Sequence, residues 1–460
     1  MNKFVSIFIF LFALCSFSVH AEETYRFRVY LKDKGFSGCS LDHPEKFLSK
    51  EAIERRKKQA IPITESDLPI SQAYLDSLSI HGVTPLFTSR WFSTVVVESS
   101  NKSVEERLSK LSIVDSVKWI WKGDASIGKP KGPESNERLE PKGDLEDSFY
   151  GYAEQQIKML NGIKLHEEGF RGEGMRVAVI DEGFSNVDRI SVFDSIKILG
   201  TYNVVYPGVS VYDCEDHGTK VLSCLAANAP GIQVGTAPNA SYWLIKSEDA
   251  RSEYPIEEDY WTAAVEFADS VGVDVVSSSL GYFKYDAKEL CYDQSQLDGQ
   301  TSLISRAAHM ASTKGILVFS SAGNEDGGSW RKITFPADAE GIITVGAITK
   351  DKKKSGFSSI GFTADQRVKP DVVALGTSCS VIDATGNIRL ANGTSFSAPI
   401  LAGLGICLWQ SLPHLTNKEI ITLMQKVGSK AKHPNEELGY GIPNVYKIYK
   451  QERKHVPNTK

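Results

Sequence analysis

Apolar and polar residues alternate in two different ways along this chain, and from residue 149 onward the pattern is that of an α/β domain. Short continuous apolar runs, typical of strands buried on both faces, are separated by stretches with helical apolar spacing. This alternation predicts a mainly parallel sheet with helices on both faces. The expected strands are Arg176–Ile180, Ile196–Gly200, Tyr242–Ile245, Asp274–Ser278, Ile316–Ser320, Ile342–Ala347 and Val372–Leu375. The expected helices are Lys220–Ala227, Tyr260–Val271, Ser302–Thr313, Ile400–Trp409 and Asn417–Val427.

Residues 24–124 have a different pattern, in which strand-like and helix-like segments follow one another in the order β-α-β-β-α-β. That order is typical of a small ferredoxin-like α+β domain. A charged insertion, Leu48–Leu68, separates the first strand from the first helix, and its run Arg55–Lys58 is expected to lie on a solvated helix face. The expected strands are Tyr25–Leu31, Thr84–Leu86, Phe92–Glu98 and Val117–Trp121, and the expected helices are Gln72–Ile80 and Val104–Leu111.

The first 21 residues are typical of a secretory signal peptide. Lys3 supplies the positive start, Phe4–Phe17 is apolar, and Val19-His20-Ala21 ends in small residues. The apolar run is shorter than the ~20 residues needed to span a bilayer, and no later segment is long and apolar enough. We therefore expect export, to a secreted, periplasmic or cell-surface location. The boundaries that these patterns predict are 1–21, 22–124, 125–148, 149–450 and 451–460.

The segment 125–148 is rich in proline, glycine and charge, as expected of an exposed linker, and 451–460 is a polar tail. The chain has 460 residues, enough for two or three domains, with 41% hydrophobic and 24% charged residues. A net charge of -5 without a long basic run excludes the footprint of a nucleic-acid-binding protein. Seven cysteines are too widely spaced to reveal any disulfide pairing, and Cys407 is expected to be a small core residue.

Candidate chemistry lies in three short segments. Asp181 directly follows a buried strand, at the position where open α/β sheets carry their sites. His217 stands just before an apolar helix. Ser395 lies in Asn392–Pro399, a Gly-Thr-Ser turn that leads into another apolar helix, with Pro399 expected in the tolerant first turn. Free N–H groups and the dipole at such a helix start stabilise negative charge beside the serine.

Each segment alone has an ordinary alternative: a turn carboxylate, a polar residue at a helix start, or a helix cap. The cluster Cys214–His217 could also suggest a metal site, but no second Cys/His pair at zinc-like spacing is near it. Together the segments read Val-Ile-Asp-Glu-Gly, His-Gly-Thr and Gly-Thr-Ser-Phe-Ser-Ala-Pro, in the chain order Asp, His, Ser. In motif and order they resemble the subtilisin-like serine proteases, the subtilases of peptidase family S8.

The resemblance implies a subtilisin-like fold and an exported serine endopeptidase that hydrolyses peptide bonds through an acyl-enzyme. It implies that Ser395 is the nucleophile, His217 the general base and acid, and Asp181 the group that orients the imidazole. Asn324, in a Ser-Ala-Gly-Asn segment after a strand, matches the family's oxyanion-hole residue. The segments that resemble the family's substrate-binding residues are Ser279, Leu280 and Gly281, with Ala322 and Gly323.

By the same resemblance, residues 22–124 are an inhibitory pro-domain, and the linker 125–148 is where maturation cleaves the chain. The implied partners are protein or peptide substrates and the enzyme's own pro-domain. The chemistry requires no cofactor, and a structural calcium ion stays open. Two alternatives remain: a silent subtilase used for binding, and an esterase of another fold, which would need a Gly-x-Ser-x-Gly elbow.

One departure from the family pattern is Glu182, where many members have Ser or Thr. It adds a second carboxylate beside Asp181 and is not expected to take part in the mechanism. An acidic segment resembles the one that borders the family's substrate cleft. Such a segment would favour Lys or Arg upstream of the scissile bond, and the alternative is a solvated loop without substrate contact. Its carboxylates are Glu248, Asp249, Glu253, Glu257, Glu258 and Asp259.

Overall fold

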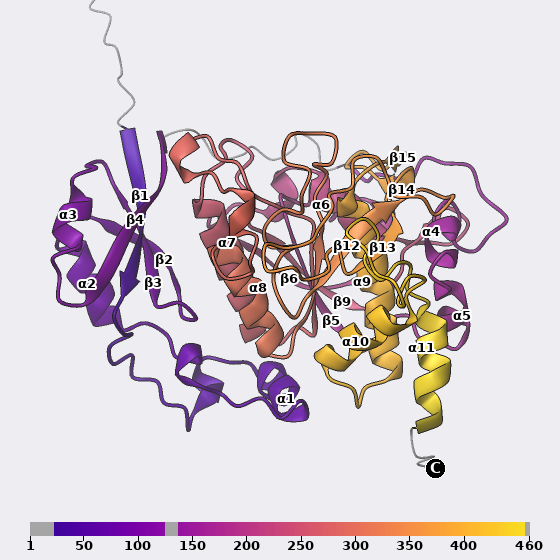
Figure 1. The fold of residues 1–460 in the computed structure, drawn as a ribbon, viewed down its shortest axis with the longest axis horizontal. Helices are drawn as coiled ribbons and strands as arrows, with labels where there is room; N and C mark the ends of the chain where they lie inside the picture. Colours follow the sequence, from indigo (N-terminus) through magenta and orange to yellow (C-terminus); the bar gives the residue numbers. More distant parts are fainter. Residues whose placement is uncertain (1–22, 125–136, 456–460) are drawn as a thin grey trace, which may run out of the picture.

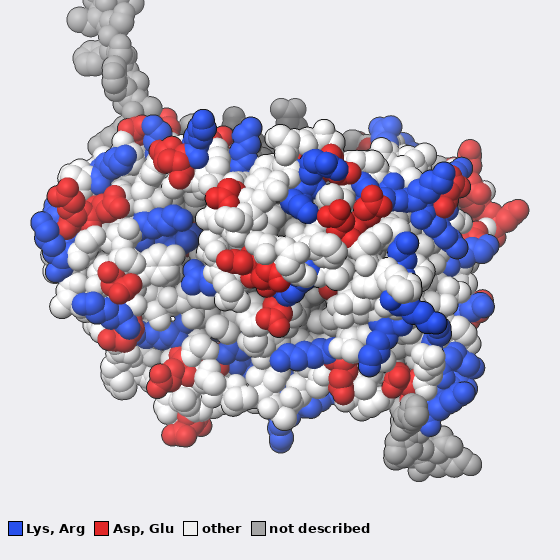
Figure 2. All heavy atoms as spheres, viewed as in Figure 1, with Lys and Arg blue, Asp and Glu red and all other residues white. Residues whose placement is uncertain are grey.

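The computed structural model describes residues 23–124 and 137–455, which form two units lying side by side (Figure 1). The expected signal peptide and residues 125–136 of the expected linker lie outside these ranges. Within them, no helix has the length and apolar character needed to cross a membrane. Charged side chains of both signs are interspersed over the face drawn in Figure 2.

The larger unit is built on a seven-stranded parallel sheet with the spatial order β13-β12-β11-β10-β5-β9-β6. All seven expected apolar runs form this sheet. The chain leaves β5 for β6 and β9 on one side and then crosses to β10 on the other. The carboxyl ends of β5 and β10 therefore flank the switch point at which open sheets carry their sites. The strands are β5 (Arg176–Asp181), β6 (Lys197–Asn203), β9 (Ser241–Lys246), β10 (Val275–Ser278), β11 (Leu317–Ser321), β12 (Ile343–Ile348) and β13 (Val372–Leu375).

Helices cover both faces of this sheet, each over its own apolar core. Alternate strand residues point to opposite faces, so Val177 and Val179 join one core whereas Ala178 and Ile180 join the other. α7 (Ile256–Ser270) and α8 (Leu303–Thr313) cover the second face (Figure 1). The first face carries α6 (His217–Ala226), α9 (Thr394–Ser411), α10 (Asn417–Val427) and α11 (Val445–Glu452), with the short α4 (Glu154–Lys158) and α5 (Gly162–Glu167) nearby.

Short elements at the periphery were not expected. Two hairpins, β7 (Asn228–Ala229) with β8 (Gln233–Val234) and β14 (Cys379–Ile382) with β15 (Ile388–Ala391), lie outside the main sheet. α11 continues to Glu452, so the expected boundary of the polar tail at residue 450 falls within a helix. The helix persists because Val445 and Ile448 are buried against the core.

The smaller unit confirms the ferredoxin-like order. Its antiparallel sheet has the order β2-β3-β1-β4, and α2 (Gln72–Ser79) and α3 (Val104–Leu108) cover one face. The other face packs against α7, where Val96 and Trp121 share a core with Tyr260 and Trp261. The strands are β1 (Glu23–Leu31), β2 (Thr84–Ser89), β3 (Thr94–Ser99) and β4 (Val114–Asp124).

The insertion overturns one expectation. It contains α1 (Lys50–Lys58), and the predicted solvated run Arg55–Lys58 instead buries its two arginines, which are 5% and 1% exposed. Both guanidinium groups pair with Asp269 in α7, and that of Arg56 also pairs with Asp67 at 2.9 Å. The prediction was wrong because the carboxylate that neutralises Arg55 lies 214 positions away in the sequence.

Candidate active site

Three segments meet at the carboxyl edge of the parallel sheet. Asp181 is the last residue of β5 and is fully buried. Its Oδ1 accepts a hydrogen bond of 2.7 Å from Nδ1 of His217, the first residue of α6. Ser395, the second residue of α9, lines the same hollow as His217. The structure thus brings together the carboxylate, the imidazole and the hydroxyl that the sequence analysis singled out.

The close approach of α6 to β5 depends on a glycine. A Cβ atom at Gly218 would lie 2.3 Å from the carbonyl oxygen of Gly183 and 3.0 Å from the Cβ of Asp181. No side chain fits at the first of these distances, because the neighbour is rigid backbone. The glycine after His217 therefore lets the helix start so close to the strand that the ring reaches the carboxylate.

The backbone around Ser395 is held by Ser279. The sequence analysis expected Pro399 in the first turn of α9, but it is the sixth residue of that helix. A proline has no N–H to donate to the carbonyl four residues earlier, which here belongs to Ser395. The hydroxyl of Ser279 donates to that carbonyl at 2.8 Å, and the Ser395 hydroxyl in turn donates to the Ser279 carbonyl at 3.4 Å. These two bonds tie the end of β10 to the start of α9.

Asn324 is oriented by Thr394, a residue to which the sequence analysis gave no role. The Asn324 Oδ1 atom accepts hydrogen bonds from the backbone N–H and from the hydroxyl of Thr394, both at 2.9 Å. Because both bonds require the amide oxygen, the NH₂ group must point the other way. Asn324 also lines the hollow, so it offers a donor beside Ser395.

Carboxylates dominate the electrostatics of the hollow. Burial lowers the pKa of the His217 imidazole, but the nearby Asp181, Glu182 and Glu248 outweigh this and raise it to about 9. Burial, followed by the charge of Asp181, raises the pKa of Glu182. Burial, followed by the charges of Glu182 and Glu253, raises the pKa of Glu248 to about 8. The imidazolium form of His217 is therefore stabilised by Glu182 and Glu248 as well as by Asp181.

Most of the expected substrate-binding residues line this hollow of about 230 Å³. Ser279, Leu280 and Gly281 form one wall together with Gly323. Ala322, expected beside Gly323, is instead fully buried and does not line the hollow. Its N–H continues the pairing of β11 by donating to the Val345 carbonyl at 3.0 Å, and its side chain joins the core under α7 and α8.

The acidic segment departs from its expected form. α7 already begins at Ile256, so Glu257, Glu258 and Asp259 form its first turn, where the helix dipole stabilises carboxylates, and all three are buried. Asp259 pairs with Arg28 of β1 in the smaller unit. The Oε1 atom of Glu258 accepts hydrogen bonds from the hydroxyls of Tyr285 and Tyr292. Of the six carboxylates, Glu248 alone lines the hollow.

Lys246 organises the rim of the hollow, and the sequence analysis overlooked it. Its side chain is fully buried at the end of β9, and its ammonium group donates to the backbone carbonyls of Glu182 and Glu248. It also pairs with the Glu215 carboxylate at 2.7 Å. A lysine that directly ends an apolar strand run was the available signal. Lys246 thereby ties together the loops that follow β5 and β9 and the segment before His217.

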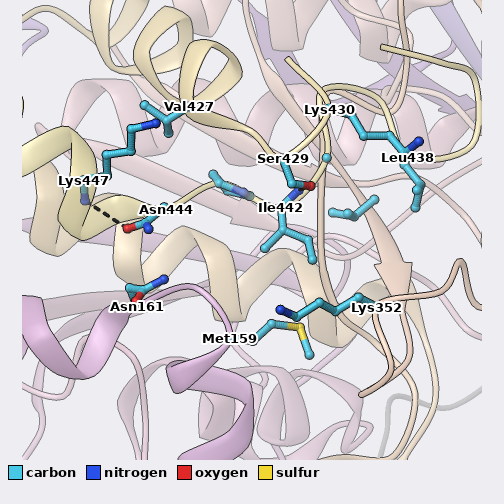
Figure 3. A pocket seen from close by; sticks show the side chains of 13 residues that line it. Met159, Asn161, Lys352, Val427, Ser429, Lys430, Leu438, Ile442, Asn444 and Lys447 are labelled. Carbon is cyan, nitrogen blue, oxygen red and sulfur yellow. Dashed lines mark hydrogen bonds between the residues drawn. The ribbon is translucent and has the colours of Figure 1, made fainter. Parts of the chain in front are cut away.

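Two other features carry no chemistry of this site. In the described parts of the chain, no group of three or more His, Cys, Asp or Glu residues is placed to hold a metal ion, and Cys214 donates to the Ser210 carbonyl. A second hollow of about 360 Å³ lies beside α11 (Figure 3), where Asn444 caps the helix. Apolar, amide, hydroxyl and lysine side chains line it, and it contains none of the candidate residues.

Comparisons with known proteins agree with this geometry. Residues 172–441, more than half of the chain, match the subtilase family, and residues 26–137 match the peptidase S8 propeptide domain of Bacteroidota. Subtilisin DY of Bacillus licheniformis is 27% identical over 62% of this chain and 93% of its own length. Subtilisin E of Bacillus subtilis is 28% identical over 62% of this chain and 68% of its own length.

A similar fold occurs in the crystal structure of MycP1 from the ESX-1 type VII secretion system. The match has a TM-score of 0.51 at 18% identity and covers 70% of this chain and 94% of that one. At this level of identity the likeness concerns the fold alone. From the family match, the subtilisin relatives and the preceding propeptide domain, we conclude that the chain belongs to the subtilase family and is a subtilisin-like serine endopeptidase with an N-terminal propeptide.

Proposed function

We propose that this protein is an exported proenzyme that cleaves peptide bonds with Asp181, His217 and Ser395 as its catalytic triad. The observation that carries the proposal is the 2.7 Å hydrogen bond from His217 to the buried Asp181 carboxylate, in a hollow that Ser395 also lines. The hydrogen bond to the buried Asp181 side chain fixes the tautomer of the imidazole, so that Nε2 carries the free lone pair. That nitrogen is the base that the serine hydroxyl requires.

The reaction begins when the Ser395 hydroxyl exchanges its bond to the Ser279 carbonyl for one to Nε2 of His217. Its oxygen attacks the substrate carbonyl carbon while Nε2 takes the proton. Collapse of the tetrahedral intermediate breaks the C–N bond, and His217 gives the proton to the departing amine. In the second half, His217 takes a proton from water while the water oxygen attacks the acyl-enzyme carbonyl. The ester C–O bond then breaks, the acyl group leaves as the carboxylic acid product, and His217 returns the proton to the Ser395 oxygen.

Two donors serve the oxyanion of each tetrahedral intermediate. The backbone N–H of Ser395 lies in the first turn of α9, where N–H groups have no intrahelical acceptor. The second donor is the Asn324 NH₂ group. Thr394 binds the Oδ1 atom of the same amide, so the NH₂ group points away from Thr394. Donors fixed before the reaction stabilise the developing charge without reorganisation. Ser279, Leu280, Gly281 and Gly323 bind the substrate on the acyl side.

Kinetics of purified variants test this assignment. We expect Ser395→Ala and Asp181→Asn to lower kcat by roughly 10⁴- to 10⁶-fold. Ser397→Ala is the matched control, because its hydroxyl bonds to the Thr394 carbonyl in the same turn of α9 and takes no part in the mechanism. Near-normal turnover by Ser395→Ala would refute the triad, and a silent subtilase would show no turnover in the wild type either.

Export and maturation follow the same proposal. Residues 1–21 direct export, 22–124 act as an intramolecular inhibitor, and cleavage within 125–148 releases the catalytic domain, which begins at residue 149 and includes all of α11, to Glu452. The chemistry of this triad needs no cofactor. N-terminal sequencing of the secreted product tests these boundaries. We expect the wild type to begin within 125–148 and Ser395→Ala to begin at residue 22. A fully active product that retains residues 22–124 would contradict the maturation step.

A further inference from the structure

The walls of the candidate active-site hollow differ in charge. Every charged side chain that lines it, apart from His217, is a carboxylate: Glu182, Glu248 and Glu325. Glu182 follows β5 and Glu248 follows β9, so both lie on the His217 side of Ser395, whereas Ser279–Gly281 follows β10 on the other side. The hollow therefore has an acidic wall, formed by Glu182 and Glu248, and an opposite side where the Ser279–Gly281 wall is uncharged and the carboxylate is Glu325, after β11.

In the described parts of the chain, the carboxyl groups of Glu182 and Glu248 form no ion pair with a lysine or arginine. Lys246 bonds to the backbone carbonyls of these two residues, and its ion pair is with the carboxylate of Glu215. The lysine thus holds both loops in place while leaving their side chains free to face the hollow. Among the described residues, no ion pair or side-chain hydrogen bond joins Glu182 or Glu248 to a lysine or arginine.

Charge behind this wall is also unbalanced. Glu257 is fully buried, and its Oε1 atom accepts the Asp249 N–H at 2.9 Å. Its Oε2 atom has no hydrogen-bond partner among the residues that the structure describes. Burial and the charges of Glu253 and Glu248 raise the pKa of Glu257 well above its usual range. The raised pKa favours the neutral form of this buried carboxyl, and a cation bound beside Glu248 would stabilise its ionised form.

Substrate geometry identifies the ligand that brings this cation. The inference rests on the proposed function. A substrate in extended conformation along Ser279–Gly281 sends successive side chains to opposite sides. The residue whose carbonyl is attacked points to the uncharged wall, so the residue before it, P2, points toward His217 and the acidic wall. We infer that Glu182 and Glu248 form a subsite for a lysine or arginine at P2 of the substrate.

Peptides that differ only at P2 test this subsite in the mature wild-type enzyme. Three internally quenched peptides carry lysine, its uncharged analogue norleucine, or glutamate at P2. Assays at pH 9 keep Glu248 mainly ionised, because its pKa is about 8. We expect kcat/KM for the lysine peptide to exceed that for norleucine by roughly 10- to 100-fold, as for a charge-assisted bond, and glutamate to be the poorest. The ratio of the two kcat/KM values should fall in 1 M salt, where the Debye length is only about 3 Å and exposed charges are largely screened.

Variants then assign the preference to the two carboxylates. Glu182→Gln/Glu248→Gln should bring the lysine-to-norleucine ratio close to one, and each single variant should give an intermediate ratio. Because the two peptides are compared at the same pH, any change in the His217 base cancels. Glu340→Gln is the matched control: this exposed glutamate lies before β12, at the opposite edge of the sheet, and should leave the ratio unchanged.

The possible results separate a failure of the P2 subsite from a failure of the protease assignment. Equal cleavage of the lysine and norleucine peptides by the wild type overturns the subsite even if no variant folds, while leaving the protease assignment intact. Failure to cleave any peptide refutes the proposed function instead. A ratio that the double variant retains, or one that appears only after EDTA removes a bound divalent cation, also overturns the inference.

Discussion

At the scale of single residues, the charge around His217 controls when this residue can act as a base. Only the neutral imidazole accepts the Ser395 proton, and three carboxylates favour the protonated form. The hydrogen bond to Asp181 fixes which ring nitrogen of His217 carries the proton. Among the described contacts, Glu182 and Glu248 form no hydrogen bond to the ring and act on it only through their negative charge. The arrangement therefore links the pH at which the enzyme works to the same glutamates that form the acidic wall.

The pKa of His217, about 9, places the acidic limb of the kcat/KM profile near pH 9. Below that pH the imidazole of the free enzyme is protonated, so kcat/KM should fall about tenfold for each pH unit. Glu182→Gln removes a nearby negative charge, lowers the pKa of the imidazolium and should move the limb to lower pH. A profile measured from pH 6 to 10 on the norleucine peptide checks both statements. A wild-type profile that is flat between pH 7 and 9 would contradict them.

Thr394 should act through Asn324 and not through the substrate. Thr394→Val removes one of the two bonds to Asn324 Oδ1 and keeps the side-chain shape. We expect kcat to fall about tenfold, equivalent to ~1.4 kcal/mol, with KM unchanged, because the oxyanion forms only after binding. Asn324→Ala, which removes the donor itself, should cost about 10²- to 10³-fold. A rise in KM without a change in kcat would show that Thr394 contacts the substrate instead.

At the scale of elements, the sequence predicted what short-range patterns determine. All seven strands of the main sheet followed from continuous apolar runs, and motifs at strand and helix ends predicted that Asp181, His217 and Ser395 lie together. The burial of the charged residues in α1 and at the start of α7 did not follow, because the partners of these residues are distant in the sequence. Arg55 meets Asp269, and Asp259 meets Arg28, more than 200 positions away in each case. Composition alone assigns such residues to the surface.

The contact between β1 and α7 gives a measurable prediction about the pro-domain. The Arg28 guanidinium binds both carboxylate oxygens of Asp259, and both side chains are 3% exposed. Arg28→Met leaves the aspartate buried and uncompensated at this interface, which typically costs about 3–5 kcal/mol. We expect the cleaved pro-domain to bind roughly 10²- to 10³-fold more weakly.

Weaker binding should shorten the delay between cleavage, seen on a gel, and the appearance of peptidase activity. Arg107→Met is the control, because Arg107 lies exposed on α3, away from the catalytic domain. Equal delays in the wild type and in Arg28→Met would mean that the ion pair contributes nothing to retention.

At the scale of the whole molecule, the pro-domain binds beside the active site without filling it. The smaller unit packs on α7, and Trp121 near the end of β4 donates to Ser252, in the loop that links the acidic wall to this helix. No residue from 23 to 124 lines the candidate active-site hollow. The described part of the pro-domain therefore contacts the loop that contains Glu248 and Ser252 but does not enter the hollow that Ser395 lines.

The central claim is that Ser395 is the nucleophile that His217 activates. The most direct measurement is mass-spectrometric mapping of the mature wild-type enzyme after reaction with a fluorophosphonate, which modifies activated serines. We expect one adduct, on Ser395, that forms in parallel with complete loss of peptidase activity. The adduct should be absent in His217→Ala and retained in Ser397→Ala. An adduct on another serine, or activity that survives full modification of Ser395, would contradict the account.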